Sequence, residues 1–163
     1  MSLRLAVFAL AAAFACSPAF GQAAMQNFSW PDMRQALEKL GSTITAEGAD
    51  GDIRYFDAKS KDDLMFTVFG FECDTKEPTQ RCSGAQLSVS FTPKDDDALA
   101  KGLDEIDYLA VDDRPSPRKN IRLTRYIIFD GGIAAENLRE NISVFLSISQ
   151  DVWKMLGDKG LLK

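Results

Sequence analysis

The 163-residue chain contains no histidine. Histidine is the commonest general base, the usual partner of a serine or cysteine nucleophile and the commonest metal ligand, so a Ser-His-Asp or Cys-His mechanism cannot operate within this chain. The glycine-rich pieces at residues 48–51 and 131–132 match neither a dinucleotide-binding fingerprint nor a phosphate-binding loop. Acids are plentiful, but no spacing singles out a glycosidase-type carboxylate pair. The sequence therefore favours a protein that is not an enzyme, with no cofactor and no metal site.

The sequence also has fewer basic than acidic residues. The chain has 19 Lys and Arg against 24 Asp and Glu, which gives a formal net charge of −5. Binding to nucleic acid or to an anionic membrane surface requires a basic face. This composition therefore argues against both kinds of partner and leaves a protein as the expected one.

One long apolar run is present, at the N-terminus. Arg4 precedes an apolar run over residues 5–15, and small residues follow up to Gly21. This order is typical of a signal peptide, here residues 1–21, and the run is shorter than the roughly 20 residues of a membrane-spanning helix. A lipoprotein with a lipidated Cys16 is the alternative. We expect a periplasmic or secreted protein without an integral membrane segment after cleavage.

Cysteine is scarce, with three residues in the chain. If Cys16 leaves with the signal peptide, Cys73 and Cys82 remain, and an even number in an exported protein indicates a disulfide. If these two face each other across an antiparallel hairpin, opposed residues have numbers that sum to 155, as 73 and 82 do. That register sets Val68 against Leu87 and makes one face apolar on both strands. The pattern thus predicts the Cys73–Cys82 disulfide independently of the cysteine count.

The opposite face of the same hairpin has an unbalanced composition. Its first strand carries three large apolar residues, Met65, Phe69 and Phe71. Its second strand is polar there, with Gln86, Ser88 and Ser90. Either a helix or loop covers this face, or the apolar residues form an exposed contact surface. Met65, Phe69 and Phe71 are therefore the candidate contact face.

The remaining pattern predicts three helices and further strands. Ser29 stands three residues before an acid and Pro31 falls in the first turn, which is typical of a helix start. Helices are predicted near residues 31–40, 94–109 and 134–156, a hairpin over 43–47 and 52–57, a loop over 112–119 and a strand over 121–129. Arg125 interrupts the apolar face of that last strand, so we expect it at a sheet edge or in a salt bridge, with a functional buried charge as the alternative.

The order of these elements predicts the fold class. One or more strands follow each of the first two helices, which is typical of an α+β domain in which helices cover an antiparallel sheet. We expect a single domain over residues 29–163, with residues 22–28 as a linker after the signal peptide.

The chain resembles the YbjN-like family of bacterial proteins over residues 33–156. The resemblance rests on the Leu-Gly end of the first helix at residues 40–41, on the cysteine hairpin over 66–87, and on Asp-Gly-Gly-Ile at 130–133. It implies a sandwich similar to that of type III secretion chaperones, and no enzymatic activity. The domain over 29–163 would then be a single YbjN-like domain.

Two functions compete at this level. The first is an exported, non-enzymatic binding or regulatory module with a chaperone-like fold, which contacts an unknown protein partner or a second copy of itself as a homodimer. The alternative is a small secreted enzyme inhibitor, whose inserting element would be the disulfide-closed loop over residues 74–81 with Lys76, Glu77 and Arg81.

Overall fold

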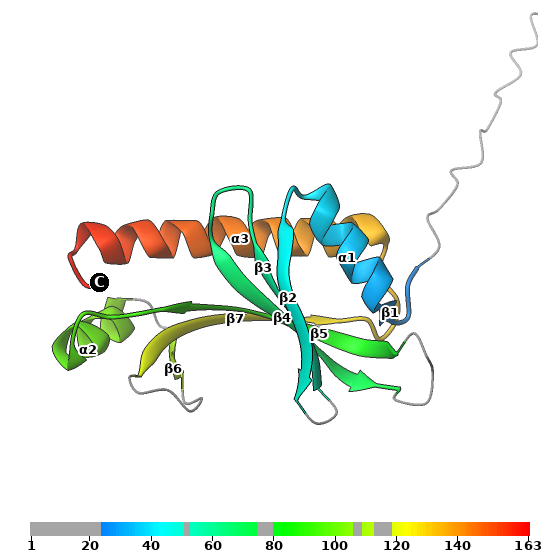
Figure 1. Cartoon of the computed structure of the whole chain (residues 1–163), viewed down its shortest axis with the longest axis horizontal. Helices are drawn as coiled ribbons and strands as arrows, with labels where there is room; N and C mark the ends of the chain where they lie inside the picture. Colours follow the sequence, from blue (N-terminus) through cyan, green and yellow to red (C-terminus); the bar gives the residue numbers. More distant parts are fainter. Residues whose placement is uncertain (1–23, 51–52, 75–79, 106–108, 113–118) are drawn as a thin grey trace, which may run out of the picture.

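The computed structural model of the chain describes residues 24–50, 53–74, 80–105, 109–112 and 119–163 (Figure 1). The predicted signal peptide, Cys16 included, lies outside these ranges. No helix in the described part of the chain combines the length and the apolar character that crossing a bilayer requires.

The fold is α+β, with a seven-stranded antiparallel sheet and three helices packed against it. The strands lie in the order β2-β3-β4-β5-β7-β6, and β1 pairs with β5. In chain order the elements are β1 (Phe28–Ser29), α1 (Trp30–Lys39), β2 (Thr43–Asp50), β3 (Ile53–Lys59), β4 (Met65–Cys73), β5 (Arg81–Phe91), α2 (Asp96–Glu105), β6 (Ala110–Asp112), β7 (Asn120–Ile128) and α3 (Ala135–Asp158). The predicted α+β class, an antiparallel sheet covered by helices, is confirmed.

Helix α1 begins at a reciprocal cap. The backbone N–H of Ser29 donates to Asp32 Oδ2 at 2.9 Å, and the N–H of Asp32 donates to Ser29 Oγ at 3.3 Å. Both bonds satisfy backbone donors that a helix start leaves without partners. The buried side is formed by Met33 and Leu37, and the helix ends before Gly41, whose positive φ of 74° suits glycine. The predicted helix start is confirmed.

Part of the segment expected to be a linker belongs to the fold. Met25 and Ile133 exchange two backbone hydrogen bonds, of 2.7 and 3.0 Å. Phe28 is fully buried, with its ring against those of Trp30 and Phe129. Burial of Phe28 and the backbone bonds to Ile133 act together against the entropy cost of ordering this segment, and both depend on distant residues that local composition does not show.

The cysteine hairpin forms in the predicted register. Val68 pairs with Leu87 and Cys73 with Cys82, so opposed residue numbers sum to 155. The Cys73–Cys82 disulfide is present, with an S–S distance of 2.08 Å. Val68 and Leu87 are fully buried on the face that the helices cover. The disulfide therefore closes a hairpin whose register the apolar residues already set.

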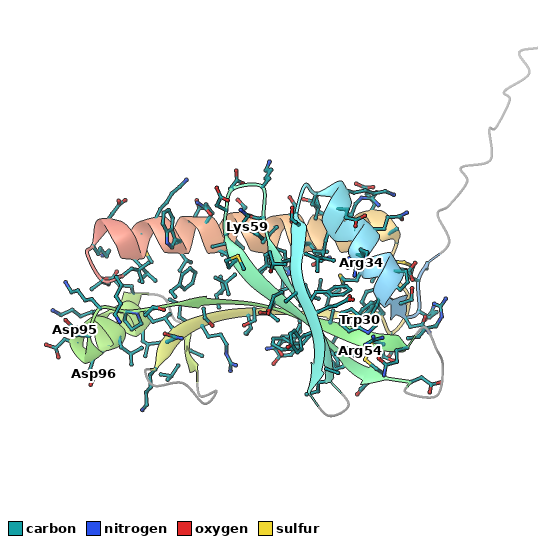
Figure 2. The ribbon with its side chains drawn as sticks, in the orientation of Figure 1. Trp30, Arg34, Arg54, Lys59, Asp95 and Asp96 are labelled. Atoms are coloured by element: carbon teal, nitrogen blue, oxygen red, sulfur yellow. A yellow bond between two sulfur atoms is a disulfide. The ribbon has the colours of Figure 1, made fainter. Side chains whose placement is uncertain are left out.

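The three helices pack on one face of the sheet, which we call the inner face. Figure 1 shows α1 and α3 on the same side of the sheet. The buried stripe of α3 repeats at helical spacing and is formed by Leu138, Ile142, Phe145, Ser149, Val152 and Leu156. Figure 2 places Trp30 on the sheet side of α1, and the Arg34 guanidinium lies 5.0 Å from the centre of the Phe56 ring. Arg34 also binds Glu47 of β2 at 2.7 Å, so α1 is fastened to the edge of the sheet.

The second helix is shorter than predicted, and a strand follows it. Helix α2 is described over Asp96–Glu105 and residue 109 is not helical, and β6 pairs with the start of β7 between the predicted helix and the predicted loop. A strand of three residues is too short to show alternation. Gly102 of α2 is buried, and a side chain there would overlap Ile121 of the sheet. Its lack of a side chain lets α2 approach β7 closely.

Arg125 lies on the inner face of β7, opposite Leu87. Strand β6 pairs only with residues 120–122 of β7. At Arg125, β7 is therefore an edge strand of the described sheet, as expected. Its guanidinium donates to Asn141 Oδ1 of α3 from Nε at 3.2 Å and from Nη2 at 2.7 Å. The partner of Arg125 is therefore the side-chain amide of Asn141, whereas the other expectation was a salt bridge to a carboxylate.

Candidate functional site

The face of the sheet opposite the helices carries a row of large side chains, one from each of four adjacent strands. The register pairs Tyr55 of β3 with Phe69 of β4, Phe69 with Gln86 of β5, and Gln86 with Tyr126 of β7. Side chains of directly paired residues point to the same side of a sheet. These four residues therefore lie side by side across the sheet.

A second row lies next to the first. Phe71 pairs with Gly84 and Gly84 with Ile128. The Phe71 ring occupies the space above Gly84 and meets the Tyr126 ring edge to face, with centroids 6.1 Å apart. In the first row the centroids of the Tyr55 and Phe69 rings are 6.2 Å apart. The rings of the two rows thus contact one another across strands.

Solvent reaches much of this surface. Tyr126 and Ile128 are each 61% exposed and Ile53 is 50% exposed, while Phe69 and Phe71 are half-buried. Within the described ranges no helix lies on this side. We call the following set the outer aromatic face: Ile53, Tyr55, Phe69, Phe71, Tyr126 and Ile128. Contiguous exposed apolar patches of this kind are characteristic of binding surfaces.

The outer aromatic face contains a hollow of about 520 Å³. Its lining is Ile53, Tyr55, Asp57, Thr67, Phe69, Gly70, Phe71, Gln86 and Arg122. Thr67 Oγ1 donates to Asp57 Oδ1 at 2.7 Å, which fixes one carboxylate at the rim. An apolar floor with a few polar groups at its margin is the usual composition of a binding pocket.

The structure brings together two of the three predicted contact residues. Phe69 and Phe71 both line the hollow, whereas Met65 pairs with Lys59 at the other end of β4 and lines a separate hollow near Trp153. Met65 is 51% exposed. It lies on the same face but outside the aromatic cluster.

Four members of the outer aromatic face were not predicted: Ile53, Tyr55, Tyr126 and Ile128. All four lie on strands that the sequence predicted at least in part. Along β3 and β7 they alternate with residues that face the helices, so period-two alternation is the signal that identifies them. Their gathering depends on the strand order, which local patterns do not specify.

The predicted inhibitory loop lies largely outside the described residues, Lys76 and Glu77 included. Arg81 is described: it is exposed, and its Nη1 donates to Asn27 Oδ1 at 2.8 Å. Its carbonyl accepts a bond of 2.8 Å from the N–H of Asp74, which closes the base of the loop. Arg81 is therefore engaged with the chain's own N-terminal segment.

In the described ranges, the titratable side chains do not indicate a metal site. No three His, Cys, Asp or Glu side chains there lie close enough together to hold a metal ion. The pKa of the Asp63 carboxyl lies below its ordinary value, because Lys59 donates a hydrogen bond to it at 2.8 Å and adds its charge. Asp63 is exposed at the β3–β4 turn, away from the hollow.

Compared with known proteins, the chain matches no family model, no curated protein and no solved structure. The outer aromatic face is therefore the feature on which a function can be based.

Proposed function

We propose that this protein is an exported, non-enzymatic binding module that holds an apolar segment of a partner protein on the outer aromatic face. The observation that carries the proposal is the distribution of layers. The helices pack on the inner face, and six large apolar side chains of the outer aromatic face have no covering layer in the described structure. Exposing them has a solubility cost that a binding role would explain.

The chemistry of the face favours a polypeptide as ligand. Aromatic residues are enriched at the centres of protein interfaces, where their area is large and few rotamers are lost. Tyr55 and Tyr126 add hydroxyl groups to the outer aromatic face, and Asp57 and Gln86, which line the hollow, supply hydrogen-bonding groups for a backbone. The acidic net charge of −5 opposes nucleic acid.

Export and family membership belong to the same proposal. The disulfide supports an oxidising compartment, which agrees with the predicted signal peptide and a periplasmic or secreted location. An antiparallel sheet with helices on one face is compatible with the YbjN-like resemblance and with a sandwich of the type III secretion chaperone kind. We therefore propose that the domain is chaperone-like in architecture and in its use of the sheet.

Absence of catalysis is a further part of the proposal, because the chain lacks histidine and its two described cysteines are bonded to each other. Purified protein is expected to show no turnover of glycoside, ester or peptide substrates. A reproducible activity that one acidic substitution abolishes would refute this part.

Binding is tested with an array of short immobilised peptides that differ in apolar content. The oxidised protein should retain peptides rich in aromatic and aliphatic residues, and Phe69→Ser should lose them. Trp153→Ser is the matched control, because Trp153 is 49% exposed on α3 and lies outside the hollow. Equal retention by the wild type and Phe69→Ser, or no retention by either, contradicts the proposal.

A further inference from the structure

Within the described ranges, one edge of the sheet is open along most of β7. Strand β6 pairs with residues 120–122 of β7, and no described segment pairs with the rest of β7 on that side. The N–H of Phe129 donates to the Ser83 carbonyl of β5 at 3.0 Å. Backbone groups of an antiparallel strand point alternately to its two sides, so odd-numbered residues of β7 face β5. Thr124, Tyr126 and Ile128 therefore direct their N–H and C=O groups to the open side.

The opposite edge of the sheet, β2, is protected. Its pairing with β3 is interrupted by a bulge between Ile44 and Ala46, and Glu47 is engaged by Arg34 of α1. Bulges and charged residues are two of the devices that prevent sheets from pairing edge to edge. Strand β7 has an unbroken register with β5 over residues 121–128 and contains no proline there, and the charged group on its open part, Arg125, is bound by Asn141 of α3 on the inner face. Its edge is therefore suited to strand addition.

Exposed apolar residues gather on this side of the molecule. Seven large hydrophobic residues are exposed in the described part of the chain, and four of them belong either to β7 or to the neighbouring flank of α3: Tyr126, Ile128, Val144 and Ile148. Val144 lies about one helical turn after Asn141, which binds Arg125 of β7, so this flank of α3 lies on the side of the open edge. The other flank, with Leu146 and Gln150, lines a hollow at the β3–β4 turn.

We propose that a second copy of this chain binds this edge, with the two β7 strands antiparallel and Tyr126 on the two-fold axis. In that register Thr124 of one copy faces Ile128 of the other, and every outward N–H and C=O of the three residues finds a partner. Arg125 faces Ile127 of the second copy, so like charges are not opposed. A register centred on Arg125 would oppose two guanidinium groups and would place residues bonded to β5 at the axis.

The extent of the apolar surface favours a second copy over a single added peptide strand. An isolated strand would cover Tyr126 and Ile128 but not Val144 and Ile148, whereas a second copy brings its own α3 flank. At the observed exposures these four side chains present roughly 400 Å² per copy, about half of the ~800 Å² that each partner buries in a stable interface. The paired backbone and Thr124 would supply much of the remainder. The pairing also continues the outer aromatic face across the axis, but it does not depend on the proposed function.

The association state of the oxidised protein tests this proposal. Sedimentation equilibrium should show a dimer. Thr124→Pro, which removes an N–H that points away from β5, should raise the dissociation constant at least about tenfold, as should Val144→Lys on α3. Trp153→Lys, at a 49% exposed position on the other flank of α3, should leave it unchanged. A monomeric wild type, or a dimer that resists both edge variants, overturns the proposal.

The register is tested by cross-linking. In a hydrogen-bonded antiparallel pair the Cα atoms lie about 5.5 Å apart, within the range of a disulfide. Under mild oxidation Tyr126→Cys should therefore give a covalent dimer in the intact mass, while Ile53→Cys should remain monomeric in mass. Cross-linking through Ile53→Cys and not through Tyr126→Cys would place the interface on the outer aromatic face and contradict the edge pairing.

Discussion

Phe71 of β4 lies over Gly84 of β5, its direct register partner, in space that any side chain at residue 84 would occupy. The missing side chain lets the ring lie across the neighbouring strand and reach Tyr126 of β7. A glycine in β5 therefore shapes the outer aromatic face. Glycine in the interior of a strand commonly marks such a close approach.

Gly84→Ala should displace the Phe71 ring towards solvent. Because Phe71 is half-buried and its ring is the mobile end of the side chain, the free energy of unfolding should fall by no more than about 1 kcal/mol. Affinity for apolar peptides should fall at the same time, since the ring leaves the face. Chemical denaturation and a peptide titration measure the two effects. Unchanged peptide affinity would separate Phe71 from the binding surface.

Two helical glycines should respond in opposite directions to the same substitution. Gly157 of α3 has open space around it, so Gly157→Ala should stabilise by about 0.5–1 kcal/mol through helix propensity. Gly102 of α2 is packed against Ile121, so Gly102→Ala should destabilise by about 1 kcal/mol or more despite the same gain. Thermal unfolding of both variants measures the difference. A higher melting temperature for Gly102→Ala would contradict the close packing of α2.

Loss of the disulfide should weaken the domain without unfolding it. The bond closes a loop with a sequence separation of 9. On the chain-entropy model its loss costs roughly 2.5–3 kcal/mol, or about 10 °C in melting temperature. Cys73→Ser with Cys82→Ala avoids a buried hydroxyl at the fully buried position 82. Free thiols at both positions in the protein purified without reductant would refute the bond.

Local patterns in the sequence predicted those parts of the fold that depend on near neighbours. The α1 cap follows from the spacing of Ser29 and Asp32, and the buried stripe of α3 follows from helical period. The hairpin register follows from two cysteines and two apolar rows, because a shift by one residue would turn every side chain to the wrong face. Each of these signals lies within a short stretch of chain.

Features that join distant stretches were missed. Phe28 pairs with Cys82 across more than fifty residues, so β1 has no local signal. Tyr126 reaches Phe71 only because β7 lies next to β5, an order that composition does not specify. The sequence therefore singled out Phe69 and Phe71 as candidate contact residues, but not the aromatic surface that surrounds them in the candidate site. Met65 lies on the same strand and face, but it is at the other end of β4 and therefore apart from Phe69 and Phe71.

The most direct test of the account compares Phe69→Ser with Phe66→Ser. These two residues of β4 face opposite sides of the sheet. Phe66 is 3% exposed beneath the helices, and Phe69 is half-buried on the outer aromatic face. The measurement is the dissociation constant for the best-retained array peptide, taken together with the free energy of unfolding. Phe69→Ser should weaken binding at least about tenfold and cost no more than about 1 kcal/mol, whereas Phe66→Ser should cost about 3 kcal/mol or more. Unchanged peptide affinity in Phe69→Ser, with a stability loss as large as that of Phe66→Ser, would assign Phe69 to the core and contradict the account.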